Sequence, residues 1–463
     1  MRFSAFTHLY FIGGNDMKRF IGFLMVFVLA FTMLAACGTN TPATQTPQSG
    51  GTSSPTTAPA SSEKIRIEFF QQKEAAAVEP YNQLIQGFMA ENPNVVIEQT
   101  YVPDAPQVFA SRVASGDIPD LFTHWPERST FWELCKQDIM LPITGADYLN
   151  KVDPNLLERC MYKGEVYCLP IAMLTFGVVY NVDMYAKYGY TTPPSTWTEF
   201  IGMLDKMKAD GQAGISWQMQ FNEGLGQQIN AFYKMALGDY NANVFFAQLA
   251  RGETTFDEHP EAKEVVYKYI KLHEYGTEDK LADDVQKMNE NLVNGKAACF
   301  ISGTWNFGSI AGINKDFNYM MHPMPLFDDT SKNIVPVGID TGLCINKKSK
   351  YTDVLLKLFD FVGNGDGCYL YCKAMNNQPI LKDVDYTVKQ LEPMVETLNA
   401  GKIFRFPHHF WQAGLDLECA NALVTLILSN HTEKDYETYF KTIENLFKNA
   451  GPTEFQGNYT QYK

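Results

Sequence analysis

Hydrophobic and polar residues follow two different periods in the first regular part of the chain. Apolar side chains alternate with charged ones from Ile65 to Phe69, which is the period of a β-strand with one buried face. Positions 81, 84, 85 and 88 are then hydrophobic, at the spacing of one helix face. Pro93 ends that helix, and residues 95–97 begin a second strand. This order predicts a βαβ unit with a parallel strand pair.

Helical periods predominate in the rest of the chain. Lys163 and Gly164 predict a tight turn between two short strands. The sequence shows no internal repeat with a period of 20–50 residues. The pattern therefore predicts an α/β fold in which helices outnumber strands. The predicted helices cover residues 106–116, 197–208, 227–237, 262–275 and 352–363.

The first 62 residues follow neither period. Lys18 and Arg19 precede an uncharged apolar stretch over residues 20–36, the layout of a secretory signal peptide. The stretch ends in Leu-Ala-Ala-Cys, which resembles a bacterial lipobox, so Cys37 is expected to carry a lipid. We expect residues 1–36 to be the signal peptide, with residues 1–16 as an upstream extension. Residues 37–62 are rich in Thr, Ser, Pro and Gly and predict a flexible linker.

Composition narrows the possible partners. The formal net charge of −14 argues against a nucleic-acid partner and weakly favours a neutral or cationic ligand. Aromatic residues make up 13% of the chain, enough to fill a core and to line a cleft as well. No CxxC motif is present, so no metal or other cofactor is expected. Cys160 and Cys168 flank the predicted turn, and a disulfide between them is one possibility.

Sequence signatures of catalysis are missing. The chain has no G-x-S-x-G elbow, no H-E-x-x-H and no phosphate-binding loop. His408 and His409 are adjacent, so their side chains point in different directions and are interpreted as polar rim residues. The acidic pairs at 283–284 and 328–329 are interpreted as solvated surface charges. We therefore predict no catalytic residue and no enzyme activity.

Several short stretches, in a common order from residue 64 onward, carry a family resemblance. Together they resemble the carbohydrate-type extracellular solute-binding proteins of ABC importers, the family that includes maltose-binding protein. The stretches are residues 114–122, 164–170, 179–185, 196–200, 294–298 followed by 303–305, and 342–350.

The resemblance implies an α/β, two-lobe periplasmic-binding-protein type II fold with a cleft between the lobes. It places hinge crossovers near residues 171–175, 323–338 and 378–385. Closure of the lobes around a ligand is then the expected motion. Lobe 1 would comprise residues 63–172 and 325–380, and lobe 2 residues 173–324 and 381–463. A return of the C-terminal helices to lobe 1 is left open.

Sugars present apolar C–H faces and a ring of hydroxyl groups, so their sites combine flat aromatic rings with fixed hydrogen-bonding groups. The resemblance places Trp305 and Trp411 as stacking rings. Residues 71–74 follow the first strand, at the edge of the sheet where α/β proteins bind ligands. The predicted ligand-binding residues are Gln71, Gln72, Glu74, His124, Trp125, Glu127, Arg128, Trp217, Glu223, Trp305, Asp340 and Trp411.

The sequence thus predicts a lipid-anchored receptor on the extracellular face of a Gram-positive type cytoplasmic membrane. It would bind a sugar or oligosaccharide as a monomer, deliver it to the transmembrane subunits of an ABC permease, and touch the membrane only through its lipid. Alternatives left open are a surface glycan-acting enzyme, a receptor for a polyamine or peptide, and a structural lipoprotein.

Overall fold

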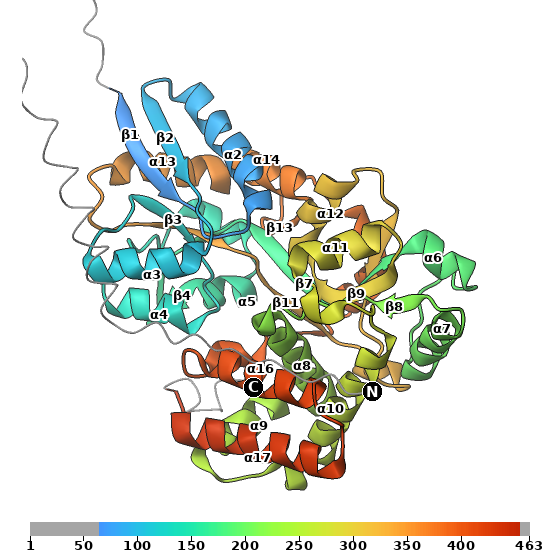
Figure 1. Ribbon diagram of the computed structural model, residues 1–463. Helices are drawn as coiled ribbons and strands as arrows, with labels where there is room; N and C mark the ends of the chain where they lie inside the picture. The colour runs from blue at the N-terminus through green and yellow to red at the C-terminus, as the bar shows by residue number, and fades with distance from the viewer. Residues whose placement is uncertain (1–63, 454–463) are drawn as a thin grey trace, which may run out of the picture. The chain divides into compact units, whose positions relative to one another are not determined.

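The computed structural model describes residues 64–453. The predicted signal peptide, the predicted lipidation site Cys37 and the predicted linker lie outside these residues. The described chain folds around two β-sheets with helices packed on their faces (Figure 1).

The first sheet is built on the predicted βαβ unit, with strand order β2-β1-β3-β12-β6. β1 and β2 are parallel, with Ile65 opposite Val95, which confirms the prediction. The hydrophobic side chains of α2, Tyr81 to Phe88, are buried as their period predicted. β3 adds in parallel, and β12 pairs antiparallel with β3 and β6. The strands and helix are β1 Ile65–Phe70, α2 Val78–Glu91, β2 Val95–Thr100, β3 Leu121–His124, β6 Leu169–Pro170 and β12 Gly342–Ile345.

Helices from distant parts of the sequence pack together beside this sheet. In Figure 1, α14 lies beside α2. Gly87 permits this packing, because a Cβ atom there would lie 2.6 Å from a methyl group of Leu370. The short hairpin β4–β5 turns at Lys163 and Gly164, whose φ angles of 50° and 86° are those of a tight turn, as predicted. The remaining elements here are α3 Ala105–Ser115, α4 Ser129–Lys136, α5 Pro154–Leu157, β4 Met161–Tyr162, β5 Glu165–Val166, α13 Thr352–Gly363 and α14 Asp366–Met375.

The second sheet is organised on the long strand β7, with strand order β14-β11-β7-β9-β8. β10 and β13 also pair with β7. Met173 of β7 lies opposite both Ile339 of β11 and Gln378 of β13. The three segments predicted to cross between the lobes are therefore hydrogen-bonded neighbours. The strands are β7 Ala172–Asn181, β8 Ala213–Ile215, β9 Ala297–Gly303, β10 Tyr319–His322, β11 Val335–Ile339, β13 Gln378–Pro379 and β14 Ile403–Phe404.

Most of the remaining helices pack around the second sheet. The C-terminal helices α16 and α17 pack on α8 and α9, at the lower end of Figure 1. Their buried side chains belong to the same hydrophobic core as those of α8 and α9. The helices are α6 Val182–Lys187, α7 Trp197–Ala209, α8 Asn222–Leu237, α9 Asp239–Arg251, α10 Pro260–Leu272, α11 Val285–Val293, α12 Phe307–Ile313, α15 Val395–Asn399, α16 Leu415–Ile427 and α17 Glu433–Ala450.

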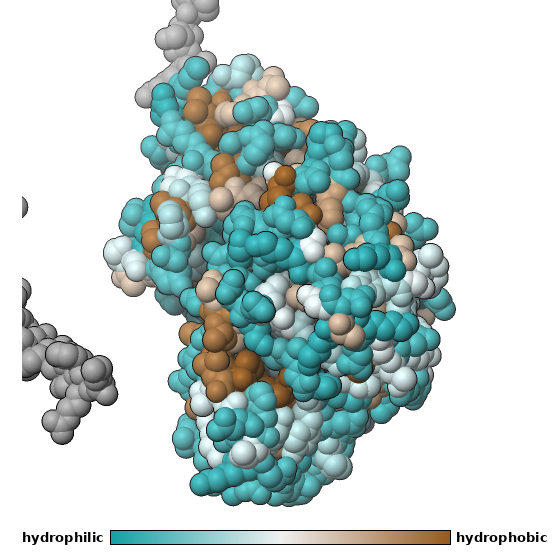
Figure 2. Space-filling model, turned by 45° about the vertical axis from the view of Figure 1, so that its right-hand side comes forward, coloured by the Kyte–Doolittle hydropathy of each residue, from teal (hydrophilic) through white to brown (hydrophobic). Residues whose placement is uncertain are grey.

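Most of the large apolar side chains are buried in the hydrophobic cores of the protein. Figure 2 shows a largely hydrophilic surface on one side of the protein, with hydrophobic residues in separate patches. The cysteines between residues 64 and 453 are free thiols, including Cys160 and Cys168, so the possible disulfide between these two is not formed. Among the helices of the same range, none combines the length and apolar character needed to cross a membrane.

Candidate ligand-binding site

Loops that follow strands of both sheets surround one large cavity. The cavity has a volume of about 720 Å³, within the usual range for small-molecule sites. Residues after β1, β3, β9, β11 and β14 contribute to its wall. Four aromatic residues line it, namely Trp125, Phe221, Trp305 and Phe406. The cavity therefore combines flat apolar surfaces with the polar ends of several strands.

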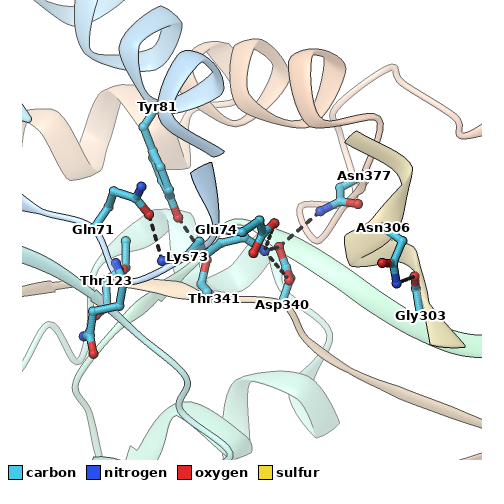
Figure 3. Close-up of polar contacts among 11 residues, drawn as sticks. Gln71, Lys73, Glu74, Tyr81, Thr123, Gly303, Asn306, Asp340, Thr341 and Asn377 are labelled. Atoms are coloured by element: carbon cyan, nitrogen blue, oxygen red, sulfur yellow. Dashed lines mark hydrogen bonds and ion pairs between the residues drawn. The ribbon is translucent and has the colours of Figure 1, made fainter. Parts of the chain in front are cut away.

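The floor of the cavity holds a buried ion pair (Figure 3). Lys73 Nζ lies 2.8 Å from both carboxylate oxygens of Asp340, and the two side chains are only 2% and 3% exposed. Burial alone would lower the pKa of Lys73, but the Asp340 and Glu74 carboxylates outweigh it and raise this pKa above its ordinary value. The amide of Asn377 donates a further hydrogen bond to Asp340 at 3.1 Å. The floor is thus a fixed arrangement of charges that compensate each other.

Hydrogen bonds from buried residues fix the loop that carries Lys73. Gln71 Oε1 accepts a hydrogen bond of 2.7 Å from the backbone N–H of Lys73, and the backbone N–H of Gln72 donates to Thr123 Oγ1 at 2.8 Å. Both glutamines are buried. Glu74, in contrast, lines the cavity, and its carboxylate lies 3.6 Å from Lys73 Nζ. Of the predicted residues in this loop, Glu74 reaches the cavity, whereas Gln71 and Gln72 support it.

A second group of charges, centred on the buried Glu127, joins four separate segments. Glu127 accepts hydrogen bonds of 2.8 Å from the backbone N–H of Ile339 and from Arg159. Arg405 Nε lies 3.3 Å from the same carboxylate. Gly338 leaves room for this carboxylate, because a Cβ atom there would overlap Oε2 of Glu127 in its present position. Glu127 therefore ties the loop after β3 to the strand β11.

Two histidines complete this part of the wall. His408 and His409 both line the cavity. Burial, reinforced by the positive charge of Arg128, lowers the pKa of His408 to about 3. Burial also lowers the pKa of His409 well below its ordinary value, together with the charges of its neighbours. Both imidazoles are therefore neutral near pH 7 and offer hydrogen bonds without a charge.

Another ion pair lies in the wall rather than the floor. Arg128 Nη2 lies 2.9 Å from Glu223 Oε1, and the side chains are 35% and 32% exposed. The guanidinium group of Arg128 stacks over the ring of Trp125 at 4.4 Å. Trp125 and Arg128 also line a smaller, adjacent cavity of about 360 Å³ together with His124. Glu223 is not itself part of the cavity lining but fixes the position of Arg128.

Trp305 follows β9 and presents its ring to the main cavity. The ring lies over Gly303, where any Cβ atom would overlap it. Asn306 fixes the turn by donating a hydrogen bond of 2.9 Å to Ser302 Oγ. It donates another of 3.2 Å to the carbonyl oxygen of Gly303 (Figure 3). Trp305 is thus in a position suited to stacking, and its contact with a ligand stays a prediction.

The structure brings together six of the predicted site residues. Glu74, Trp125, Glu127, Arg128, Trp305 and Asp340 all line the main cavity. His124 lies behind Trp125, in the smaller cavity, where burial lowers its pKa to about 3.

Two of the predicted tryptophans lie elsewhere, which corrects their predicted placement. Trp217 is completely buried and stacks on His273, with ring centroids 3.7 Å apart. Trp411 is 2% exposed and packs between Phe246 and Phe447, each with its centroid at 4.7 Å. Both rings fill the second hydrophobic core because helices on either side cover them, which their local sequence does not reveal.

Other lining residues were missed from the sequence. The predicted site residues do not include Lys73, Phe221, Asn289 and Phe406, which line the cavity, and His408 and His409 line it too rather than its rim. Phe406 to His409 directly follow the short strand β14. The rule that selected residues 71–74, that ligands bind at strand ends, would have found them had β14 been predicted.

Two sheets joined by adjacent crossing strands, with a cavity formed by strand-end loops, define the type II periplasmic-binding-protein fold. The chain belongs to the family of bacterial extracellular solute-binding proteins, whose sequence pattern matches residues 83–394. The multiple sugar-binding protein of Streptococcus mutans serotype c is similar, with 26% identity over 416 residues, 88% of this chain and 93% of that protein. The maltotriose-binding protein of Pyrococcus abyssi is 24% identical over 250 residues, 53% of this chain and 50% of that protein.

Solved structures agree on the fold. The solute-binding protein RafE in complex with raffinose superposes with a TM-score of 0.73 at 17% identity, over 84% of this chain and 100% of that chain. The ligand-free form of RafE from Streptococcus pneumoniae gives a TM-score of 0.69 at 17% identity, over 84% and 98% of the two chains. A sugar transporter from Bacillus licheniformis in complex with stachyose gives 0.66 at 16% identity, over 82% and 100%.

Proposed function

We propose that this chain is the substrate-binding component of an ABC importer and that its main cavity binds a neutral oligosaccharide. The observation that carries the proposal is the combination of aromatic rings and charge-compensated polar groups in one cavity. Rings such as Trp125 and Trp305 suit the C–H faces of sugars. Carboxylates and neutral imidazoles suit their hydroxyl groups. The names of the multiple sugar-binding and maltotriose-binding relatives support the same ligand class.

The charges of the cavity favour a neutral ligand. Each lining carboxylate or cation lies within 4 Å of an opposite charge. A charged ligand would therefore have to break an existing pair, whereas hydroxyl groups can add hydrogen bonds to carboxylates that still have free lone pairs. This pairing argues against the polyamine alternative.

We further propose that the protein works outside the cytoplasmic membrane as a monomer tethered through Cys37, without chemical change to its ligand. The acidic pocket groups are engaged with cations, which leaves them poorly placed for acid–base catalysis. The lobe boundaries remain proposals. The pairing of β11 with β7 and β14 supports moving residues 335–339 from lobe 1 to lobe 2.

A thermal-shift screen of the purified protein tests the ligand class. The probes are maltotriose, raffinose, stachyose, a chitin oligosaccharide and a xylan oligosaccharide, with spermidine and a mixed peptide pool as comparators. A ligand present at one hundred times its dissociation constant stabilises the folded state by about 2.7 kcal/mol. A shift with a sugar supports the proposal. A shift with spermidine or peptides alone overturns the ligand class, and release of shortened sugars would support an enzyme instead.

A further inference from the structure

Arg128 and Glu223 come from different parts of the fold. Arg128 immediately precedes α4, beside the first sheet, and Glu223 lies in the first turn of α8, whose buried side chains belong to the second core. Their side chains meet at 2.9 Å. The pair therefore links the two halves of the cavity wall.

The two cations that line the main cavity differ in access. Lys73 is buried and held by Asp340, with a side chain only 2% exposed. Arg128 is 35% exposed and stacks on the ring of Trp125. An anion that enters the cavity can therefore reach Arg128 but not Lys73. The carboxylate of Glu223 already pairs with Nη2 of Arg128, so such an anion would have to displace it or share the guanidinium group with it.

We propose that Glu223 is a specificity-determining residue that keeps anionic ligands, including acidic sugars, out of the site by occupying Arg128. The inference rests on the proposed function and deepens it, since it names the charge class of sugar that the site rejects. Glu223 acts through Arg128 and does not need to touch the ligand.

Two effects produce the rejection. Glu223 belongs to the same chain as Arg128, so it competes for the guanidinium group at a high effective concentration. A uronic acid that displaced it would also leave two carboxylates beside one cation, and like charges repel. A neutral sugar disturbs neither partner. Partly exposed ion pairs contribute little to stability, so the pair can be altered without unfolding the protein.

The first experiment needs no sugar. Iodide and acrylamide quench the tryptophan fluorescence of the wild type, of Glu223→Gln and of a matched control, Asp383→Asn. Asp383 forms an ion pair of 2.8 Å with Lys151 and does not line the main cavity. Glu223→Gln should raise the iodide quenching constant relative to acrylamide, because the freed Arg128 attracts iodide to Trp125. The control should behave as wild type, and Trp125→Phe should abolish the increase.

The second experiment measures binding of trigalacturonate and of the neutral sugars of the screen by calorimetry. Glu223→Gln should bind trigalacturonate about fivefold or more tightly than wild type, equivalent to roughly 1 kcal/mol. The ratio of trigalacturonate affinity to neutral-sugar affinity should therefore rise in this variant and not in Asp383→Asn.

The outcomes separate the two proposals. An unchanged iodide response in Glu223→Gln overturns the role of Glu223, as does a wild type that binds trigalacturonate as tightly as any neutral sugar. If no sugar binds the wild type, the proposed function fails. The iodide result then still decides whether Glu223 excludes anions.

Discussion

The exposed wall of the cavity and the buried layer around it contain the same chemical groups. Each has an ion pair, Arg128–Glu223 in the wall and Lys73–Asp340 in the floor. Each has an indole ring, Trp305 in the wall and Trp411 in the adjoining core. The difference is access to water. A buried group cannot be removed alone without a cost in stability, whereas an exposed group is free to recognise a ligand.

The largest effect should come from the floor. Asp340→Asn leaves the positive charge of Lys73 buried without its main partner. Removing one partner of a buried pair costs about 3–5 kcal/mol of unfolding free energy, measured by urea denaturation. The double variant Lys73→Met with Asp340→Asn should recover most of the loss, because it removes the uncompensated charge. Equal instability of both variants would contradict this interpretation.

Trp411→Ala should be almost as costly. The ring is enclosed by Phe246 and Phe447, so its removal leaves a cavity in the second core. Such truncations cost about 3–5 kcal/mol. The midpoint of urea unfolding should fall strongly. If instead stability were kept and sugar binding lost, Trp411 would belong to the site after all.

Acidification should weaken the folded state by a smaller amount for each buried histidine, and His273, His408 and His409 add to the effect because their pKa values are also lowered. Burial lowers the pKa of His124 to about 3 and that of His322 to about 4, so both are neutral in the folded protein at pH 7. Below pH ~6.5 the unfolded chain binds protons that the folded chain does not, so stability falls as the pH falls. Each histidine adds a slope of at most ~1.4 kcal/mol per pH unit. Unfolding free energies at pH 7.5, 6.5 and 5.5 would measure it, and His124→Gln should reduce the slope.

The smallest effect on folding should come from Trp305→Ala. The ring lies against the cavity, so its loss should cost less stability than the loss of Trp411. Sugar affinity should fall about tenfold or more, equivalent to roughly 1.4 kcal/mol. Calorimetric titration with the sugar found in the screen measures this. An unchanged sugar affinity would show that Trp305 does not contact the ligand. Exposure to the cavity would then not be enough to make a tryptophan part of the binding site.

Local periodicity was enough to predict the βαβ unit, because the burial of four α2 side chains follows from their spacing, namely Tyr81, Leu84, Ile85 and Phe88. It could not separate Trp305 from Trp411. Both tryptophans come after a strand in the sequence, and the packing of α9 and α17 over Trp411 distinguishes them. Lys73 was missed for a related reason, since its partner Asp340 lies 267 residues away and no local pattern records that contact.

The three crossing segments have a mechanical consequence. Met173 lies opposite Ile339 on one segment and Gln378 on another, so backbone hydrogen bonds join all three into a narrow ribbon. None of the three crossing segments can bend by itself, because bending would break its backbone hydrogen bonds to the neighbouring segment. Opening and closing of the lobes should therefore follow one shared twisting coordinate, with the ribbon's amide protons among the slowest to exchange in both forms.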